Sequence, residues 1–403
     1  MQIGDQLELD ITDVAFGGAG VARHVGQVVF IPLVLTGERV EAVITGITAR
    51  FARGECRRVL VPSSSRVTPP CPHFGVCGGC RYQHADYPLQ LQMKRKQVAD
   101  ILQRIGGFAA PPVEAMTASP IAYGYRNKLT LHGPGRPGFQ RSGGGSLLPI
   151  NRCALACEAI NRKLNELATT RLKIGEDLIV RGNAAGKVFS YRESTRRPIS
   201  AARSCASEQA AAMIIEESLA GFSFRVPAQS FFQVNHGVHE LLLTRVSRLF
   251  EECACPNLVD AYCGVGAFAL ALAGQAKRVI GIESDPAALT WAIENAARMG
   301  VIHGRFRHGR VERLLQPALR ESAAEPTCVI LDPPRAGCDE RVIRVLMRER
   351  PRQILYLSCV PPILARDLKK LRSGGYELKR VIPCDMFPQT AHCEVIAELI
   401  FPK

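Results

Sequence analysis

Cys359 is the residue whose type and position most clearly suggest covalent chemistry. It follows the short apolar run 354–357 and precedes two prolines, which places a thiol at the end of an expected buried strand. Open α/β sheets bind ligands at the carboxyl ends of their strands, so Cys359 is a candidate nucleophile. The alternative is a buried structural thiol, because free cysteines are often buried. A carboxylate, Glu394, directly precedes the strand expected at residues 395–400.

A cysteine-rich stretch suggests a metal site. Cys71, Cys77 and Cys80 fall within ten residues, and two glycines precede the last of them. A structural zinc site normally has two close ligand pairs, and no second close pair follows. The spacing therefore favours an iron–sulfur cluster with one remote cysteine ligand. From the spacing alone, that ligand is either Cys153 or Cys157.

A glycine turn and an acidic residue suggest a nucleoside-binding site. The buried run that contains Asp260 leads into a turn with Gly264, and the next strand ends at Glu283, nineteen residues later. That distance is typical of a carboxylate that binds ribose hydroxyls. The turn lacks the third glycine of a dinucleotide fingerprint, which disfavours NAD. The layout is that of S-adenosylmethionine methyltransferases.

Positioning these groups requires a parallel sheet. From residue 231 onward, strands and helices alternate, which predicts a doubly wound α/β domain. One of its strands ends at Asp332, where two prolines fix the following loop. Residues 121–230 are predicted to be rich in β-structure.

The first 60 residues predict a small β-barrel of short alternating strands. After its last predicted strand, residues 49–58 carry four arginines around one phenylalanine. Such a combination suits phosphate contact and base stacking on RNA. A charged barrel rim without a partner explains the same residues equally well.

Composition narrows the class of protein. The chain has 403 residues and a formal net charge of +14, which predicts two or three domains and favours a polyanionic partner. A solvated basic surface is the alternative. There are fifteen cysteines, no secretory signal and no apolar run of membrane-spanning length. We therefore expect reduced thiols or metal ligands in a cytoplasmic protein that does not enter a membrane.

Seven strings together resemble the bacterial RNA uracil-5 methyltransferase family, which modifies 23S rRNA or tRNA. They follow the family order over nearly the whole chain. They occupy residues 71–80, 123–128, 231–235, 260–266, 332–335, 358–359 and 387–394.

The resemblance implies an α/β fold with three parts. A Rossmann-like S-adenosylmethionine methyltransferase domain is expected at residues 85–114 and 229–403. An OB-like, RNA-binding TRAM barrel is expected at residues 1–60. A small central β domain with a 4Fe–4S cluster is expected at residues 61–84 and 115–228.

The resemblance also implies roles for individual residues. It assigns the cluster ligands to Cys71, Cys77, Cys80 and Cys153. Contacts with S-adenosyl-L-methionine are expected at Gln233, Tyr262, Gly264, Glu283 and Asp332. Cys359 matches the nucleophile, and Glu394 matches the base that removes the C5 proton.

The implied activity is methylation of carbon 5 of a uridine through a covalent adduct between Cys359 and carbon 6. We expect 23S rRNA rather than tRNA as the substrate, and a monomeric enzyme. The competing hypotheses are a tRNA uracil-5 methyltransferase, a catalytically inactive RNA-binding homologue, and a methyltransferase that acts on DNA cytosine or on protein.

Three positions depart from the family pattern. Val360 stands where the family usually has asparagine, Ala267 where asparagine or threonine is frequent, and Arg310 where many members carry an acid. Losing an amide beside Cys359 removes a potential hydrogen bond to the uracil or to the loop. None of the three replaces the nucleophile, the base or Glu283, so we expect activity.

Overall fold

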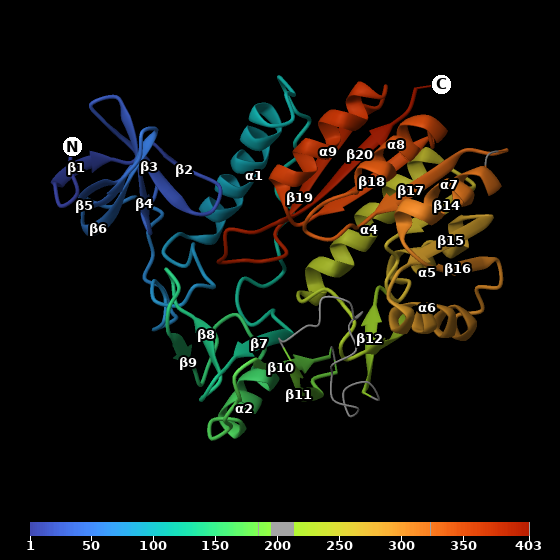
Figure 1. The fold of residues 1–403 in the computed structure, drawn as a ribbon, viewed down its shortest axis with the longest axis horizontal. Helices are drawn as coiled ribbons and strands as arrows, with labels where there is room; N and C mark the ends of the chain where they lie inside the picture. Colours follow the sequence, from blue (N-terminus) through green and yellow to red (C-terminus); the bar gives the residue numbers. More distant parts are fainter. Residues whose placement is uncertain (184, 195–212, 323, 403) are drawn as a thin grey trace. The chain divides into compact units, whose positions relative to one another are not determined.

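The structure is a computed structural model that describes residues 1–183, 185–194, 213–322 and 324–402 (Figure 1). It divides into two compact units. Unit 1 consists of Met1–Gln97, Phe139–Leu148 and Phe387–His392. Unit 2 consists of Val98–Gly138, Pro149–Met386 and Cys393–Lys403.

Unit 1 begins with a six-stranded sheet in the order β1-β5-β6-β4-β3-β2. All neighbouring strands are antiparallel except the parallel pair β4–β6. Alternate aliphatic residues such as Val29, Ile31 and Val40 are fully buried and form its core. The strands are β1 (Gln6–Asp10), β2 (Asp13–Val14), β3 (Ala19–His24), β4 (Gln27–Pro32), β5 (Arg39–Ile47) and β6 (Phe51–Val61).

The arginine-rich stretch was predicted to follow the last strand, but most of it belongs to β6. Ala52 and Gly54 point into the barrel, whereas Arg53 and Glu55 are exposed. The inward residues are too small to give a strong apolar alternation. For that reason the sequence did not reveal the strand.

The three cysteines of the predicted metal loop lie in the turns between β6 and α1 (Tyr87–Arg104) in unit 1. Helix α1 begins in unit 1 and ends in unit 2. Val98 and Leu102 are buried one turn apart, as the apolar spacing of this stretch predicts.

The β-rich region of unit 2 contains antiparallel strands in the order β11-β10-β7 and a separate hairpin, β12–β13. Ile179, Tyr191 and Ile215 are among the buried residues that pack together there. The chain passes between the two units at β8 and β9. The elements are β7 (Lys128–His132), β8 (Gly138–Gln140), β9 (Leu147–Pro149), α2 (Glu158–Glu166), β10 (Glu176–Gly182), β11 (Val188–Ser194), β12 (Ile214–Leu219) and β13 (Phe222–Pro227).

The remainder of unit 2 is built on a seven-stranded sheet in the order β16-β15-β14-β17-β18-β20-β19. The first five strands are parallel, and β20 is antiparallel to both of its neighbours. The strands are β14 (Asn257–Ala261), β15 (Arg278–Glu283), β16 (Gly304–His308), β17 (Thr327–Leu331), β18 (Gln353–Ser358), β19 (Glu377–Cys384) and β20 (Glu394–Ile400). The central strands are buried on both faces, as parallel sheets require.

Helices connect these strands and lie against the sheet (Figure 1). Strand order reverses between β14 and β17, and open α/β sheets bind ligands at the carboxyl edge of such a switch point. The helices are α4 (His236–Cys253), α5 (Ala267–Ala271), α6 (Pro286–Arg298), α7 (Val311–Glu321), α8 (Glu340–Glu349) and α9 (Pro361–Ser373), with a 3₁₀ turn at Ala273–Gln275.

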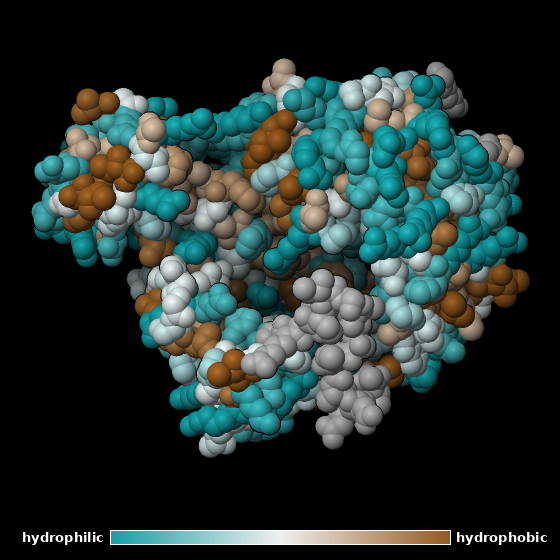
Figure 2. Space-filling model, in the orientation of Figure 1, coloured by the Kyte–Doolittle hydropathy of each residue, from teal (hydrophilic) through white to brown (hydrophobic). Residues whose placement is uncertain are grey.

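Within the described residues, no helix is long and apolar enough to cross a membrane. The face shown in Figure 2 is largely hydrophilic, with scattered hydrophobic residues. Such a surface agrees with the ordinary polar composition of the chain.

Candidate active site

The carboxyl edge of the large sheet gathers most of the residues predicted to do chemistry. Tyr262 follows β14, Glu283 ends β15 and Asp332 follows β17. Cys359 follows β18, and Glu394 begins β20. All of these strands are neighbours in one sheet, so residues more than a hundred positions apart reach a common edge.

Backbone amides orient the Glu283 carboxylate. One of its oxygens accepts a hydrogen bond from the Gly264 amide at 2.9 Å. The other accepts from the amides of Ser284 and Asp285, at 2.6 and 2.7 Å. Three fixed donors hold the carboxylate in one orientation, and its remaining lone pairs can receive ribose hydroxyls.

The loop after β14 leaves room beside this carboxylate. Tyr262 and Gly264 both adopt positive φ angles, of 75° and 55°. The Tyr262 amide donates to the carbonyl of Ile282 at 3.0 Å, which ties the bent loop to β15. A Cβ atom placed on Gly264 would meet no described atom within 4 Å. The loop can therefore approach a ligand with its backbone.

Asp260 was noted in the sequence, but it was not among the predicted site residues. It is 1% exposed within β14, and Oδ2 accepts from the Ala269 amide at 3.0 Å. Its other oxygen has no hydrogen-bond partner among the described residues. Burial, together with the Asp332 and Glu283 charges, raises its pKa to about 7, although the hydrogen bond from the Ala269 amide lowers it. A carboxylate inside an apolar strand was the signal that could have identified it.

Gln233 lies in the loop between β13 and α4, where it is 6% exposed. Its backbone carbonyl accepts a hydrogen bond from the Asn127 side chain at 3.3 Å. Asn235, two residues later, caps α4 by accepting from the Val238 amide. Gln233 belongs to a loop and not to a strand of the large sheet, and its contact with the cofactor stays a prediction.

Strand register brings the predicted nucleophile and base together. Ser358 on β18 pairs with Val395 on the antiparallel strand β20. Cys359 is the next residue outward on one strand, and Glu394 is the next on the other. The two therefore face each other across the end of the ladder.

Burial and neighbouring charges decide the protonation of these groups. Burial, followed by the Glu394 charge, raises the pKa of the Cys359 thiol to about 11, and Arg335 opposes this increase. Burial and the Asp332 charge raise the pKa of Glu394 well above its ordinary value. Burial also raises the pKa of Asp332. The two carboxyl groups titrate as an interacting pair that retains protons more readily than exposed acids.

The residue after the nucleophile is Val360, the N-cap of α9. Its side chain makes no capping hydrogen bond, whereas its amide donates to the Ser358 hydroxyl at 3.1 Å. Ser358 thus fixes the backbone around Cys359 without an asparagine at the cap. The positive end of α9 also lies directly after the thiol, and helix N-termini favour thiolates.

The structure does not support the predicted cluster site. Cys71, Cys77 and Cys80 share one loop of unit 1, and Cys153 belongs to unit 2. Nowhere in the described ranges do three or more histidine, cysteine, aspartate or glutamate side chains form a group that could hold a metal. Burial raises the pKa of Cys77, although a backbone hydrogen bond from Gly79 lowers it. The cysteines of the described residues therefore give no support to the predicted 4Fe–4S cluster.

The residues at the sheet edge do fit an adenosyl cofactor. Glu283 is prepared for ribose hydroxyls, the Gly264 loop leaves open space, and Asp260 presents an unpartnered oxygen within the described chain. The strand order, the glycine loop and the acidic residue at the end of the second strand, Glu283, define a class I S-adenosylmethionine-dependent methyltransferase.

Comparison with known proteins identifies the family. The sequence profile of the tRNA (uracil-5-)-methyltransferase family matches residues 214–400, and that of the TRAM domain matches residues 1–56. The chain is 35% identical to an uncharacterized RNA methyltransferase of Synechocystis sp., covering 99% of this chain and 97% of that protein. A similar protein from Nostoc sp. is 33% identical over the same shares of the two chains. The chain therefore belongs to the RNA uracil-5 methyltransferase family.

A solved structure has the same fold. It is the Pyrococcus abyssi tRNA (uracil-54, C5)-methyltransferase in complex with S-adenosyl-L-homocysteine. The TM-score is 0.73 at 24% identity, covering 98% of this chain and all of that one. This likeness and the TRAM match confirm the predicted α/β fold with an N-terminal TRAM domain.

Proposed function

We propose that the protein methylates carbon 5 of a uridine in RNA, with Cys359 as nucleophile and Glu394 as base. The observation that carries the proposal is the pairing of Ser358 with Val395, which sets Cys359 opposite Glu394 at the cofactor edge. Carbon 5 of uracil is a weak nucleophile. A thiol can activate it by adding to carbon 6, and a carboxylate can then remove the C5 proton so that the methylated base leaves the thiol.

The proposed reaction begins when the Cys359 thiolate adds to carbon 6 of the uracil. The electron pair of the C5–C6 double bond moves into the ring carbonyl, which makes carbon 5 enolate-like. S-adenosylmethionine supplies the methyl group when it is bound. Glu394 then takes the C5 proton, the double bond re-forms and the C6–S bond breaks, which releases the thiolate.

An RNA that contains 5-fluorouridine tests this mechanism. Fluorine at carbon 5 leaves no proton for Glu394, so the adduct should accumulate as a protein–RNA band that resists denaturation. Cys359→Ala should give no band. If wild-type protein binds the RNA and cofactor without forming an adduct, the inactive RNA-binding hypothesis replaces this one.

We propose 23S rRNA as the substrate, because the barrel and the cysteine-rich loop resemble the rRNA-modifying branch of the family. The alternative is tRNA, for which the structurally similar Pyrococcus abyssi methyltransferase is named. Mapping of 5-methyluridine in both RNAs from a deletion strain separates the two. Loss from 23S rRNA alone supports the proposal, and loss from tRNA alone supports the alternative.

The iron–sulfur cluster stays a prediction from the spacing of Cys71, Cys77, Cys80 and Cys153. Protein purified without oxygen should be brown and contain about four irons per chain if the prediction is right. One zinc or no metal would refute it.

A further inference from the structure

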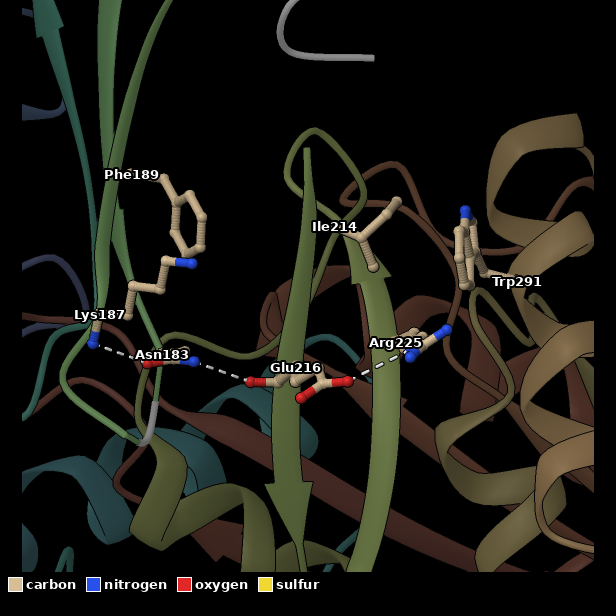
Figure 3. Close-up of a pocket in the computed structure, with 7 residues that line it drawn as sticks. All are labelled: Asn183, Lys187, Phe189, Ile214, Glu216, Arg225 and Trp291. Carbon is tan, nitrogen blue, oxygen red and sulfur yellow. Dashed lines mark hydrogen bonds and ion pairs between the residues drawn. The ribbon is translucent and has the colours of Figure 1, made fainter. Parts of the chain in front are cut away.

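Unit 2 has a pocket of about 310 Å³ between two β-hairpins and helix α6 (Figure 3). β11 and the turn before it supply Lys187 and Phe189, β12 and β13 supply Ile214, Glu216 and Arg225, and α6 supplies Trp291. Its volume is near the lower end of the range for small-ligand sites, roughly 300–1,000 Å³, which suits one nucleotide rather than a duplex.

Aromatic and aliphatic surfaces face the interior of this pocket. Phe189 and Ile214 are half-buried, and Trp291 is also only partly covered. Figure 3 shows the rings of Phe189 and Trp291 on opposite walls, with Ile214 between them. The Phe189 ring packs against the buried cluster of Ile179, Tyr191 and Ile215, whereas the partly covered indole of Trp291 can stack with a nucleobase of any sequence.

Positive groups lie beside these rings. The ammonium of Lys187 is 5.2 Å from the Phe189 ring centroid, and it makes no ion pair with any described residue. The Arg225 side chain pairs with Glu216 only through Nε, at 3.3 Å, so its two terminal nitrogens can still donate. With Glu216 as the single carboxylate among the described lining residues, the pocket favours an anion.

Hydrogen bonds hold the walls in place. The Asn183 side chain accepts from the Lys187 amide at 2.9 Å and donates to the Glu216 carbonyl at 3.0 Å (Figure 3). The Asn295 side chain accepts from the Arg225 amide at 2.9 Å and donates to the Val265 carbonyl at 3.2 Å. Val265 belongs to the glycine loop of the cofactor site, so the pocket frame and that loop are directly bonded.

We propose that this pocket binds one unpaired nucleotide of the RNA substrate, away from the uridine that reacts. The base stacks against Trp291, and the adjoining phosphate contacts Arg225 and Lys187, whose ammonium lies over the Phe189 ring. The inference rests on the proposed RNA substrate. It adds a contact with a second nucleotide, which Cys359 and Glu394 do not make. Nucleotides that flank a target base fix its position, so the pocket contributes to the choice of uridine.

Trp291 makes the proposal directly measurable, because it is the only tryptophan in the chain. Full-length protein, saturated with S-adenosylhomocysteine, is titrated with single-stranded hexauridylate under selective excitation of tryptophan. We expect saturable quenching, since a stacked base lies against the indole. Hexauridylate should bind more tightly than uridine 5′-monophosphate, and equal affinities would overturn RNA as the source of the nucleotide.

Two variants test the lining. Lys187→Ala removes an exposed charge, and Phe189→Leu retains apolar packing without a ring. Each should weaken the quenching titration about tenfold, because the first variant loses a phosphate contact and the second loses the ring that holds the Lys187 ammonium in place. Lys369→Ala removes one exposed charge from α9 and should leave the titration unchanged.

The outcomes separate this proposal from the proposed function. If RNA is retained on filters and methylated while Trp291 fluorescence stays constant, the pocket proposal is wrong and the enzyme assignment stands. Equal effects of Lys187→Ala and Lys369→Ala would also refute it. Failure of the wild type to form 5-methyluridine or the covalent adduct contradicts the proposed function itself.

Discussion

The Tyr356 hydroxyl donates a 2.7 Å hydrogen bond to Oδ2 of Asp367, and both side chains are fully buried. The Cys338 amide donates to the same carboxylate oxygen at 3.1 Å and to the Tyr356 hydroxyl at 3.3 Å. Asp367 lies on α9, which follows Cys359, whereas Cys338 ends the loop that begins at Asp332. One buried carboxylate therefore links the two loops that carry the predicted chemistry.

Removal of this link should reduce turnover more than cofactor affinity. Tyr356→Phe should cost about 1 kcal/mol of stability through the lost hydrogen bond. It should also lower kcat, because the loops are held less precisely, and leave KM for the cofactor nearly unchanged. Asp367→Ala should have a larger effect on kcat than Asp367→Asn, which keeps an acceptor. Steady-state kinetics and thermal unfolding measure both quantities.

Tyr376→Phe is the matched control. The Tyr376 hydroxyl is also buried, and it donates to the carbonyls of Leu346 and Pro351, which are not in either catalytic loop. Tyr376→Phe should lower the stability of the protein without changing kcat. If Tyr356→Phe changes only stability in the same way, the network is structural and has no positioning role.

Formation of the Cys359 adduct should accelerate as pH rises. The pKa of the Cys359 thiol is raised to about 11, because burial and the Glu394 charge oppose ionisation of the thiol. Below that pKa the thiolate fraction grows about tenfold per pH unit, so adduct formation on 5-fluorouridine RNA should speed up between about pH 7 and pH 9. Arg335 lowers this pKa, so Arg335→Gln should slow the reaction at each pH.

Arg341→Gln, which removes an exposed charge from α8, should leave the profile unchanged. Quenched-flow sampling followed by denaturing gels measures the rate. A rate independent of pH across this window would mean that RNA binding itself lowers the thiol pKa or that another step limits the reaction.

The sequence located the ends of strands more reliably than it located residues whose position depends on tertiary packing. Glu283 and Cys359 were identifiable because apolar runs locate buried strands, and parallel strands present their carboxyl ends at one edge. Asp367 could not be identified, since a single acid in a helical pattern is usually exposed. The sequence pattern also did not separate β12 and β13 as two strands. The Trp291 pocket depends on the packing of this hairpin against α6.

The Glu283 carboxylate should contribute strongly to cofactor affinity. Glu283→Gln replaces one oxygen by an amide that cannot accept from the Gly264, Ser284 and Asp285 backbone in the same way. Loss of one charged acceptor is worth about 1.5–3 kcal/mol, so S-adenosylhomocysteine should bind roughly 10–150-fold more weakly. Isothermal titration calorimetry measures this directly. Glu294→Gln, on the exposed face of α6, should bind normally, and equal affinities in all three proteins would exclude Glu283 as a ribose ligand.

Glu394→Gln should separate the two halves of the proposed reaction. The amide has nearly the same shape, so Cys359 can still add to carbon 6 of an ordinary uridine, and carbon 5 can still be methylated. Without a base at this position the C5 proton remains, and release should slow by about 10²–10⁴-fold. The protein–RNA adduct should therefore persist on unmodified RNA, where wild type shows none. Glu398 lies on the same strand, where it accepts a hydrogen bond from the Gln353 side chain, and Glu398→Gln should release product normally. Normal release by Glu394→Gln would assign the proton to another acceptor, and Asp332 is a candidate because its charge raises the pKa of Glu394.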